Sequence, residues 1–201
     1  MWWVLACSTP SPEAAPTEAT WLGGTVADAD GAPLAGARLQ ACAEVCAVAD
    51  SDADGTFAFE GLWDGAWSLH ATGPDPDDAE LVLPIALQGM REVAVVVPRL
   101  GPPVAVPAEP AWLEVAPGLT LRLSAEELPG ITEVRAGPLD AGWLGDGLSD
   151  DVVRGWSLSP FGAGAGVAFE VAGDAACTSA DGTSWEACDG VLPGFGSLVE
   201  R

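Results

Sequence analysis

Short apolar runs that alternate with polar residues recur along this chain, and glycine, proline or aspartate interrupts each of them. From Trp67 to Ala71, for example, every second residue is apolar, so Trp67, Leu69 and Ala71 share one side of an extended chain. Gly (25) and Pro (17) are spread through the 201 residues, and no stretch combines length, helical periodicity and freedom from both. The pattern predicts an all-β protein of short strands and tight turns.

The charge of the chain excludes some classes of partner. It has 30 acidic and 7 basic residues, a formal net charge of −23. Nucleic acid and anionic lipid headgroups would be repelled, whereas cations or a basic partner would be attracted. The alternative is that the acidity only keeps an exported protein in solution, which requires no partner. Because a phosphate backbone would be repelled in either case, we expect no nucleic-acid binding.

The first residues resemble the processing site of a bacterial lipoprotein. Val4-Leu5-Ala6-Cys7 looks like a lipobox, in which small and aliphatic residues precede a lipidated cysteine, and a polar, proline-rich tether follows. Only six residues precede Cys7 and none is basic. Either the signal is unusually short, the true start lies upstream, or the terminus is merely apolar. We expect residues 1–20 to be the signal and the tether, and we expect a lipid on Cys7 to anchor the protein in the membrane.

Four further cysteines form two locally spaced pairs, Cys42 with Cys46 and Cys177 with Cys188. Pairing within each is the simplest of three connectivities, and two disulfides would indicate an oxidising compartment. Zinc is the competing interpretation, but neither pair has C-x-x-C spacing and His70 is the single histidine. No later run of about 20 apolar residues predicts a membrane-spanning helix. We therefore expect an extracytoplasmic protein of the outer membrane or cell surface.

Residues 21–100 carry strand and turn signals in the order of a known family. The motifs are Gly24-Thr25-Val26, Asp30 to Ala37, Asp52 to Leu62 and Gly65 to Leu69. They resemble the carboxypeptidase regulatory-like domain, which implies a seven-stranded, transthyretin-like sandwich of the carbohydrate-binding-like fold group. That family is non-catalytic and occurs beside peptidases, in surface proteins and in front of outer-membrane receptors. Gly31, Gly55 and Gly65 are expected to supply positive φ at turns.

A proline-rich stretch, 101–110, predicts a stiff linker to a second domain, 111–201. Further alternating runs cover Trp112–Val115, Leu119–Leu123, Val152–Leu158 and Val167–Val171. Gly118–Leu128, Gly155–Gly162 and Phe169–Val171 resemble a ZU-five type β-sandwich module, and Asp181–Glu186 resembles its last strand. That resemblance implies protein–protein contact and scaffolding. Ser124 is expected to cap one short helical turn. The predicted fold class is two small antiparallel β-sandwich domains in tandem.

Aspartates alternate at Asp50, Asp52 and Asp54, as they do at the start of a calcium loop. Such a loop needs a bidentate acid at its twelfth position, which is Gly61 here, and Glu60 is one residue short. A solvated hairpin turn is the alternative. We expect no cofactor and keep the three aspartates as the calcium candidates.

The chain lacks a recognisable catalytic set. His70 has the opposite parity to Trp67 and Leu69, which predicts a surface histidine. There is no G-x-S-x-G motif, and the four late cysteines look paired. A glycosidase with two carboxylates would need a deep cleft, which two small sandwiches rarely provide. We expect a protein that is not an enzyme.

Nine tryptophans and no tyrosine are present, and tryptophan rings can stack on sugars. Trp67, Trp112 and Trp156 lie in alternating strands, where core packing is the default, whereas Trp63 and Trp143 lie near glycine-rich turns and are the candidates for a sugar site.

Two functions remain open. The first is a structural or protein-interaction lipoprotein whose partner is an unknown envelope protein or glycan. The second is a carbohydrate- or calcium-binding module that serves a separate enzyme or receptor. A line of exposed tryptophans would favour the second, and tryptophans buried throughout would favour the first.

Overall fold

The computed structural model describes residues 20–140, 152–160, 162–164, 166–179, 185–188, 190–193 and 197–200. Sixteen strands in four sheets make up the regular structure of this part of the chain. It contains no helix that is both long and apolar enough to cross a membrane. The predicted all-β class is confirmed.

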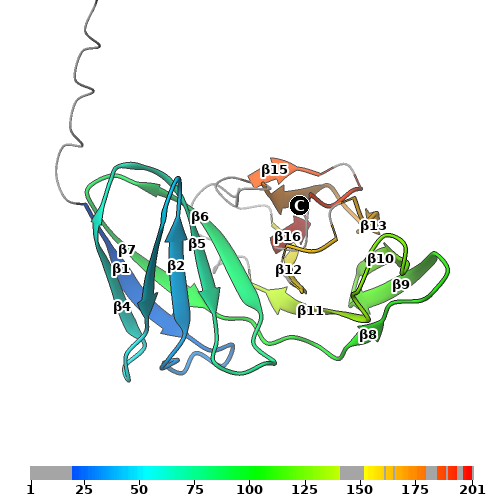
Figure 1. Cartoon of the computed structure of the whole chain (residues 1–201), viewed down its shortest axis with the longest axis horizontal. Coiled ribbons are helices and arrows are strands. Elements are labelled where there is room, and N and C mark those ends of the chain that lie inside the picture. Colours follow the sequence, from blue (N-terminus) through cyan, green and yellow to red (C-terminus); the bar gives the residue numbers. More distant parts are fainter. Residues whose placement is uncertain are drawn as a thin grey trace, which may run out of the picture.

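Seven strands of the first half form two sheets around one apolar core (Figure 1). They are β1 (Thr20–Ala27), β2 (Arg38–Cys42), β3 (Cys46–Asp50), β4 (Thr56–Leu62), β5 (Gly65–Thr72), β6 (Glu80–Leu87) and β7 (Met90–Val96). One sheet has the order β4-β1-β7 and the other β3-β2-β5-β6. Apolar residues at every second position fill the space between the sheets, with Leu22, Leu39 and Trp67 fully buried. This is the predicted seven-stranded sandwich.

One strand pair of this sandwich is not antiparallel. β7 runs parallel to β1, with Trp21 opposite Met90 and Gly23 opposite Glu92, while β4 runs antiparallel along the other edge of β1. The chain crosses over from β6 in the other sheet before it enters β7, and such a crossover lets two neighbouring strands share a direction. β1 is therefore the central strand of a three-stranded sheet.

Two Asp-Ala-Asp-Gly turns of this half have the same geometry. They span Asp28–Ala32 and Asp52–Thr56. In each, the first carboxylate accepts hydrogen bonds from the backbone N–H groups two and four residues ahead, at 2.8–3.0 Å. Gly31 and Gly55 have φ of 83° and 75°, as expected, and a Cβ on Gly55 would lie 2.4 Å from the carbonyl oxygen of Val26. Gly65 has φ of 151°.

The second half also has two sheets around an apolar core. Its strands are β8 (Val104–Ala105), β9 (Ala111–Ala116), β10 (Leu119–Leu123), β11 (Glu133–Leu139), β12 (Arg154–Ser159), β13 (Phe169–Glu170), β14 (Ala175–Thr178), β15 (Trp185–Ala187) and β16 (Ser197–Glu200). The sheet orders are β13-β10-β9 and β15-β14-β16-β12-β11-β8. Within 101–110, predicted as a linker, β8 pairs with β11. Ser124 accepts a hydrogen bond from the Glu127 amide at 3.1 Å and caps a turn rather than a helix.

The six-stranded sheet of the second half packs against the first half (Figure 1), where β12 and β14 contact β6. Val82 of β6 has the parity opposite to the core residues of its strand and is nevertheless fully buried. The Ser157 hydroxyl donates to the carbonyl oxygen of Glu80 at 2.6 Å, and Arg135 donates to the Asp77 carboxylate at 2.8 Å. The second half therefore packs over β6 on the outer face of β5 and β6, called the β5–β6 face below.

Candidate functional site

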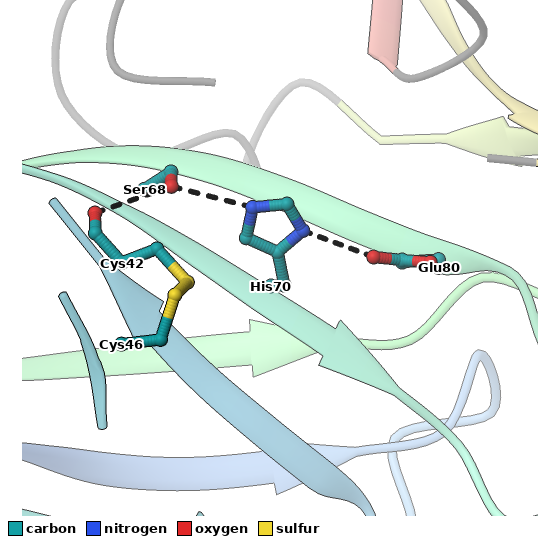
Figure 2. Close-up of a disulfide and its surroundings, with 5 residues drawn as sticks. All are labelled: Cys42, Cys46, Ser68, His70 and Glu80. Carbon is teal, nitrogen blue, oxygen red and sulfur yellow. Dashed lines mark hydrogen bonds and ion pairs between the residues drawn. A yellow bond between two sulfur atoms is a disulfide. The ribbon is translucent and has the colours of Figure 1, made fainter. Parts of the chain in front are cut away.

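Ser68, His70 and Glu80 form a hydrogen-bonded chain on this covered face (Figure 2). His70 Nδ1 lies 2.9 Å from Glu80 Oε1, and His70 Nε2 lies 3.3 Å from Ser68 Oγ. β5 supplies the serine and histidine two residues apart, and the neighbouring β6 supplies the carboxylate. Serine, histidine and carboxylate in this order are the parts of a hydrolase triad. Whether these three residues could act as one depends on whether Ser68 is placed as a nucleophile.

The serine of this chain is placed for structure rather than for attack. A nucleophilic serine has to be reached by its substrate, whereas Ser68 is 1 % exposed, and its hydroxyl lies within 3.3 Å of the carbonyl oxygen of Cys42. The hydrogen bonds among Ser68, His70 and Glu80, together with the contact to Cys42, therefore connect β5 and β6 to the end of β2. His70 was predicted as a surface residue, but only 18 % of its side chain is exposed, on the face where the second half packs over β6. The prediction used strand parity, which carries no information about that cover.

Both predicted disulfides are present, Cys42–Cys46 and Cys177–Cys188. The first joins the last residue of β2 to the first residue of β3 across a hairpin, and the second joins β14 to the residue after β15. Adjacent pairing is therefore confirmed. Cys7, the predicted lipidation site, lies outside the described residues.

The carboxylate of Asp52 is committed to its own turn. Its Oδ2 accepts from the Thr56 hydroxyl at 2.6 Å and its Oδ1 from the Thr56 amide at 2.8 Å. These hydrogen bonds, that of the hydroxyl first, hold the pKa of Asp52 below its usual 3.8. The described residues contain no group of three or more potential metal ligands, so Asp50, Asp52 and Asp54 are not gathered around a common point. Calcium binding gains no support from this geometry.

The predicted sugar-binding tryptophans do not form an exposed line. Trp63 is partly buried and packs on Trp67, with ring centroids 4.5 Å apart, and its carbonyl oxygen accepts the Trp67 indole N–H at 2.9 Å. Trp67 is fully buried and Trp156 is 2 % exposed, as core packing requires. Trp143 lies outside the described residues. In this geometry Trp63 serves mainly as a cover for the core.

Trp112 departs from its prediction in the other direction, since it was expected in the core and is 47 % exposed. Along β9, Val115 is buried and Leu113 partly buried, whereas Trp112 shares its exposed parity with Glu114. The period of the strand, rather than the size of the ring, decides which side faces water.

A trough of about 660 Å³ lies on the outer face of the β4-β1-β7 sheet, and Trp21 lines it. A Cβ on Gly23 would stand 2.3 and 2.7 Å from two atoms of the Trp21 benzo ring. The indole therefore occupies the space above Gly23 and lies along β1 instead of standing away from it. Sequence reasoning missed this residue, although the Trp21-Leu22-Gly23 spacing, which puts a glycine beside the ring on the same face, could have revealed it.

Small side chains and carboxylates surround this ring. The other lining residues are Gly24, Thr25, Asp50, Asp52, Thr56, Phe57, Ala58, Glu92, Val93 and Ala94. Strand pairing places Ala58 and Glu92 on either side of Gly23, and Thr56 and Ala94 on either side of Thr25. The trough is thus an open, mixed polar and apolar surface on three adjacent strands.

No protein-family model matches the chain, and no curated protein matches its sequence. Among solved structures it is similar to a candidate carbohydrate-binding protein from Bacteroides uniformis, with 8 % identity and a TM-score of 0.34 over 66 % of this chain and 55 % of that one. It is also similar to a DUF3823 family protein from Parabacteroides merdae, with 13 % identity and a TM-score of 0.32 over 90 % and 79 %. The chain thus spans about half (55 %) of the Bacteroides uniformis protein.

Proposed function

We propose that the chain is a non-catalytic lipoprotein of the bacterial cell envelope that acts as a structural and protein-interaction module. A lipid on Cys7 holds it at the outer membrane or cell surface, and residues 8–20 are the tether. The first half is a carboxypeptidase regulatory-like domain and the second a ZU-five type module. The partner is a protein or glycan of the envelope.

The observation that carries this proposal is the covered face between the two halves. Val82 is fully buried there, Ser157 is hydrogen-bonded to the Glu80 backbone, and the apolar cluster of the first half continues into the second through Leu139, Ala176 and Val199. Two sandwiches packed in this way keep a fixed relative orientation, because separating them would expose apolar surface and buried polar groups. A stiff body of this kind suits a module that positions partners.

The use of the polar side chains supports the non-catalytic part of the proposal. Ser68, His70 and Glu80 are hydrogen-bonded into the covered face, and Asp52 orders a turn. These groups therefore stabilise the fold. The two disulfides support the extracytoplasmic part, because such bonds persist in oxidising compartments.

The proposal is tested by the intact mass of the full chain, expressed in a bacterium and recovered from the membrane fraction. We expect a mature protein that begins at an acylated Cys7 and is four hydrogens lighter than the reduced chain. The matched variant Cys7→Ser should appear in the soluble fraction with both disulfides formed. An unprocessed, soluble wild-type chain with five free thiols would refute the anchor and the compartment together.

A further inference from the structure

We propose that the trough beside Trp21 binds a neutral sugar ring of a glycan, which stacks on the indole. This site goes beyond the structural role proposed above and does not depend on the lipid anchor. It lies on the β4-β1-β7 sheet, whereas the second half packs on the β5–β6 face of the first half (Figure 1).

The ring is held in place by the strand beneath it. The atoms of the Trp21 benzo ring take the space of the missing Gly23 side chain, so the ring is supported by backbone rather than by flexible side chains. A ring with this support loses little freedom when a ligand covers it, which lowers the entropic cost of binding. Trp21 is only partly buried and lines the trough, so part of its surface is available to a ligand.

The size of the trough and the residues beside the ring suit a sugar. Ala58, Ala94 and Thr25 are small, and the volume of about 660 Å³ falls within the roughly 300–1,000 Å³ of small-molecule sites. A sugar ring has an apolar C–H face and a polar edge, and an indole offers an apolar surface of matching size to that face. The small side chains leave room beside the indole for a sugar ring.

Carboxylates at the border of the trough supply partners for the polar edge. Glu92 lies beside Gly23 on β7, and Asp50 ends β3. The Asp52 carboxylate already accepts hydrogen bonds from its turn, so Glu92 and Asp50 are the acceptors for ligand hydroxyls. Hydrogen bonds from hydroxyls to carboxylates are short and charge-assisted.

The charge of the molecule restricts the class of sugar. The net charge is −23 and the trough contains three acidic residues, so uronic, sulfated or phosphorylated sugars would be repelled. A cation could also be attracted to an indole beside carboxylates. The Thr25 hydroxyl and the small side chains of Ala58 and Ala94 favour a broad, hydroxylated ligand over a compact cation, and the experiment below separates the two.

The test is calorimetric titration of the full, disulfide-bonded chain with four neutral probes: maltohexaose, cellohexaose, xylohexaose and mannohexaose. At least one should bind. Trp21→Ala should weaken that binding by about tenfold or more, whereas Trp21→Phe, which keeps an aromatic ring, should retain most of it. Trp112→Ala, which removes an exposed ring elsewhere, should leave it unchanged. Glu92→Gln should change it by less than about fivefold, because an amide oxygen still accepts a hydrogen bond.

A second variant keeps the proposal testable if Trp21→Ala fails to fold. Ala94→Leu fills the trough from an exposed position on β7 and should also weaken binding by about tenfold. Lack of binding to all four probes would overturn the proposal, as would binding that neither variant alters. Binding of tetramethylammonium or oligolysine that depends on Trp21 and is abolished by Glu92→Gln, without sugar binding, would overturn it in favour of a cationic partner.

Discussion

The two outer faces of the first sandwich differ in what lies against them, and the side chains that each face carries do not reveal the difference. The β5–β6 face carries Ser68, His70 and Glu80, which look suited to water, yet the second half covers it. The β4-β1-β7 face carries Trp21 and Met90, which look suited to a core, yet Met90 is 82 % exposed. The first face is used to join the halves, and the second remains available to a ligand.

The comparison teaches that alternation decides which residues share a face but not what that face meets. Trp67, Leu69 and Ala71 point into the core as their period requires. Whether the opposite face meets water or another sheet depends on residues such as Ser157, which lies 77 positions after Glu80 in the sequence. Tertiary cover of this kind leaves no local pattern in a single sequence.

The largest effect should come from a charge placed on the covered face. Val82→Asp buries a carboxylate where the second half packs, and we expect it to lower the free energy of unfolding by about 4 kcal/mol or to prevent folding. Ala86→Asp, on the same face of the same strand but exposed, should change it by less than about 0.5 kcal/mol. Urea unfolding of both variants makes the comparison, and equal small effects would mean that the face is open.

The disulfide of the covering sheet should contribute more than that of the covered sheet. Cys177 and Cys188 are 11 residues apart and close a longer loop than Cys42 and Cys46, which are 4 apart. From loop-closure entropy, serine replacement should lower the free energy of unfolding by about 3 kcal/mol for Cys177–Cys188 and by about 2 kcal/mol for Cys42–Cys46. Urea unfolding of the two double variants ranks them, and the reverse order would contradict the loop argument.

A smaller effect should follow from the ion pairs of Asp77. Arg135 donates to Asp77 at 2.8 Å and to the carbonyl oxygen of Gly101 at 2.8 Å with 19 % of its side chain exposed, whereas Arg99 lies 3.9 Å from Asp77 and is 66 % exposed. Arg135→Met should cost about 1–2 kcal/mol and Arg99→Met close to nothing. Thermal unfolding at two salt concentrations checks both variants. A larger loss of stability in the Arg99 variant would show that the ion pair between Arg135 and Asp77 does not help to join the two halves.

The smallest effect should come from Asp52, which lines the trough on the β4-β1-β7 face and whose contribution to stability should depend on pH. The folded pKa of Asp52 lies below its unfolded value, so its contribution to stability is complete above that unfolded value and is lost as the pH falls through the folded pKa. Asp52→Asn should lower the Tm by a few degrees at neutral pH, and the difference from wild type should vanish in strong acid. Asp54→Asn serves as the control. A Tm difference that does not change with pH would show that the charge of Asp52 has no role.

Strand positions could be predicted where alternation is strong and long. The predicted strand Leu119–Leu123 has the observed bounds of β10. β11 was not predicted, and it contains Gly137 and Pro138, two residue types that are uncommon inside strands. In the structure, Gly137 lets the backbone of Arg99 approach, and a Cβ there would lie 2.6 Å from the Arg99 carbonyl oxygen. That approach depends on a distant segment of the chain.

The candidate site was less predictable than the fold. The disulfides followed from spacing, since each pair is local. The tryptophans were judged by their nearness to turns, which selected Trp63 and missed Trp21. A trough whose lining comes from β1, β3, β4 and β7 and from the turn at Asp52 depends on a sheet order that the sequence does not state.

Hydroxyl-radical footprinting of the intact, full-length chain, with mass spectrometry of the modified side chains, tests the central claim most directly, because it compares the two outer faces in one sample. The account predicts rapid modification of Met90, measurable modification of Trp21, and protection of Val82 and His70. Modification of Val82 and His70 at the rate expected for open surface residues would contradict it, since the second half would then not cover the β5–β6 face.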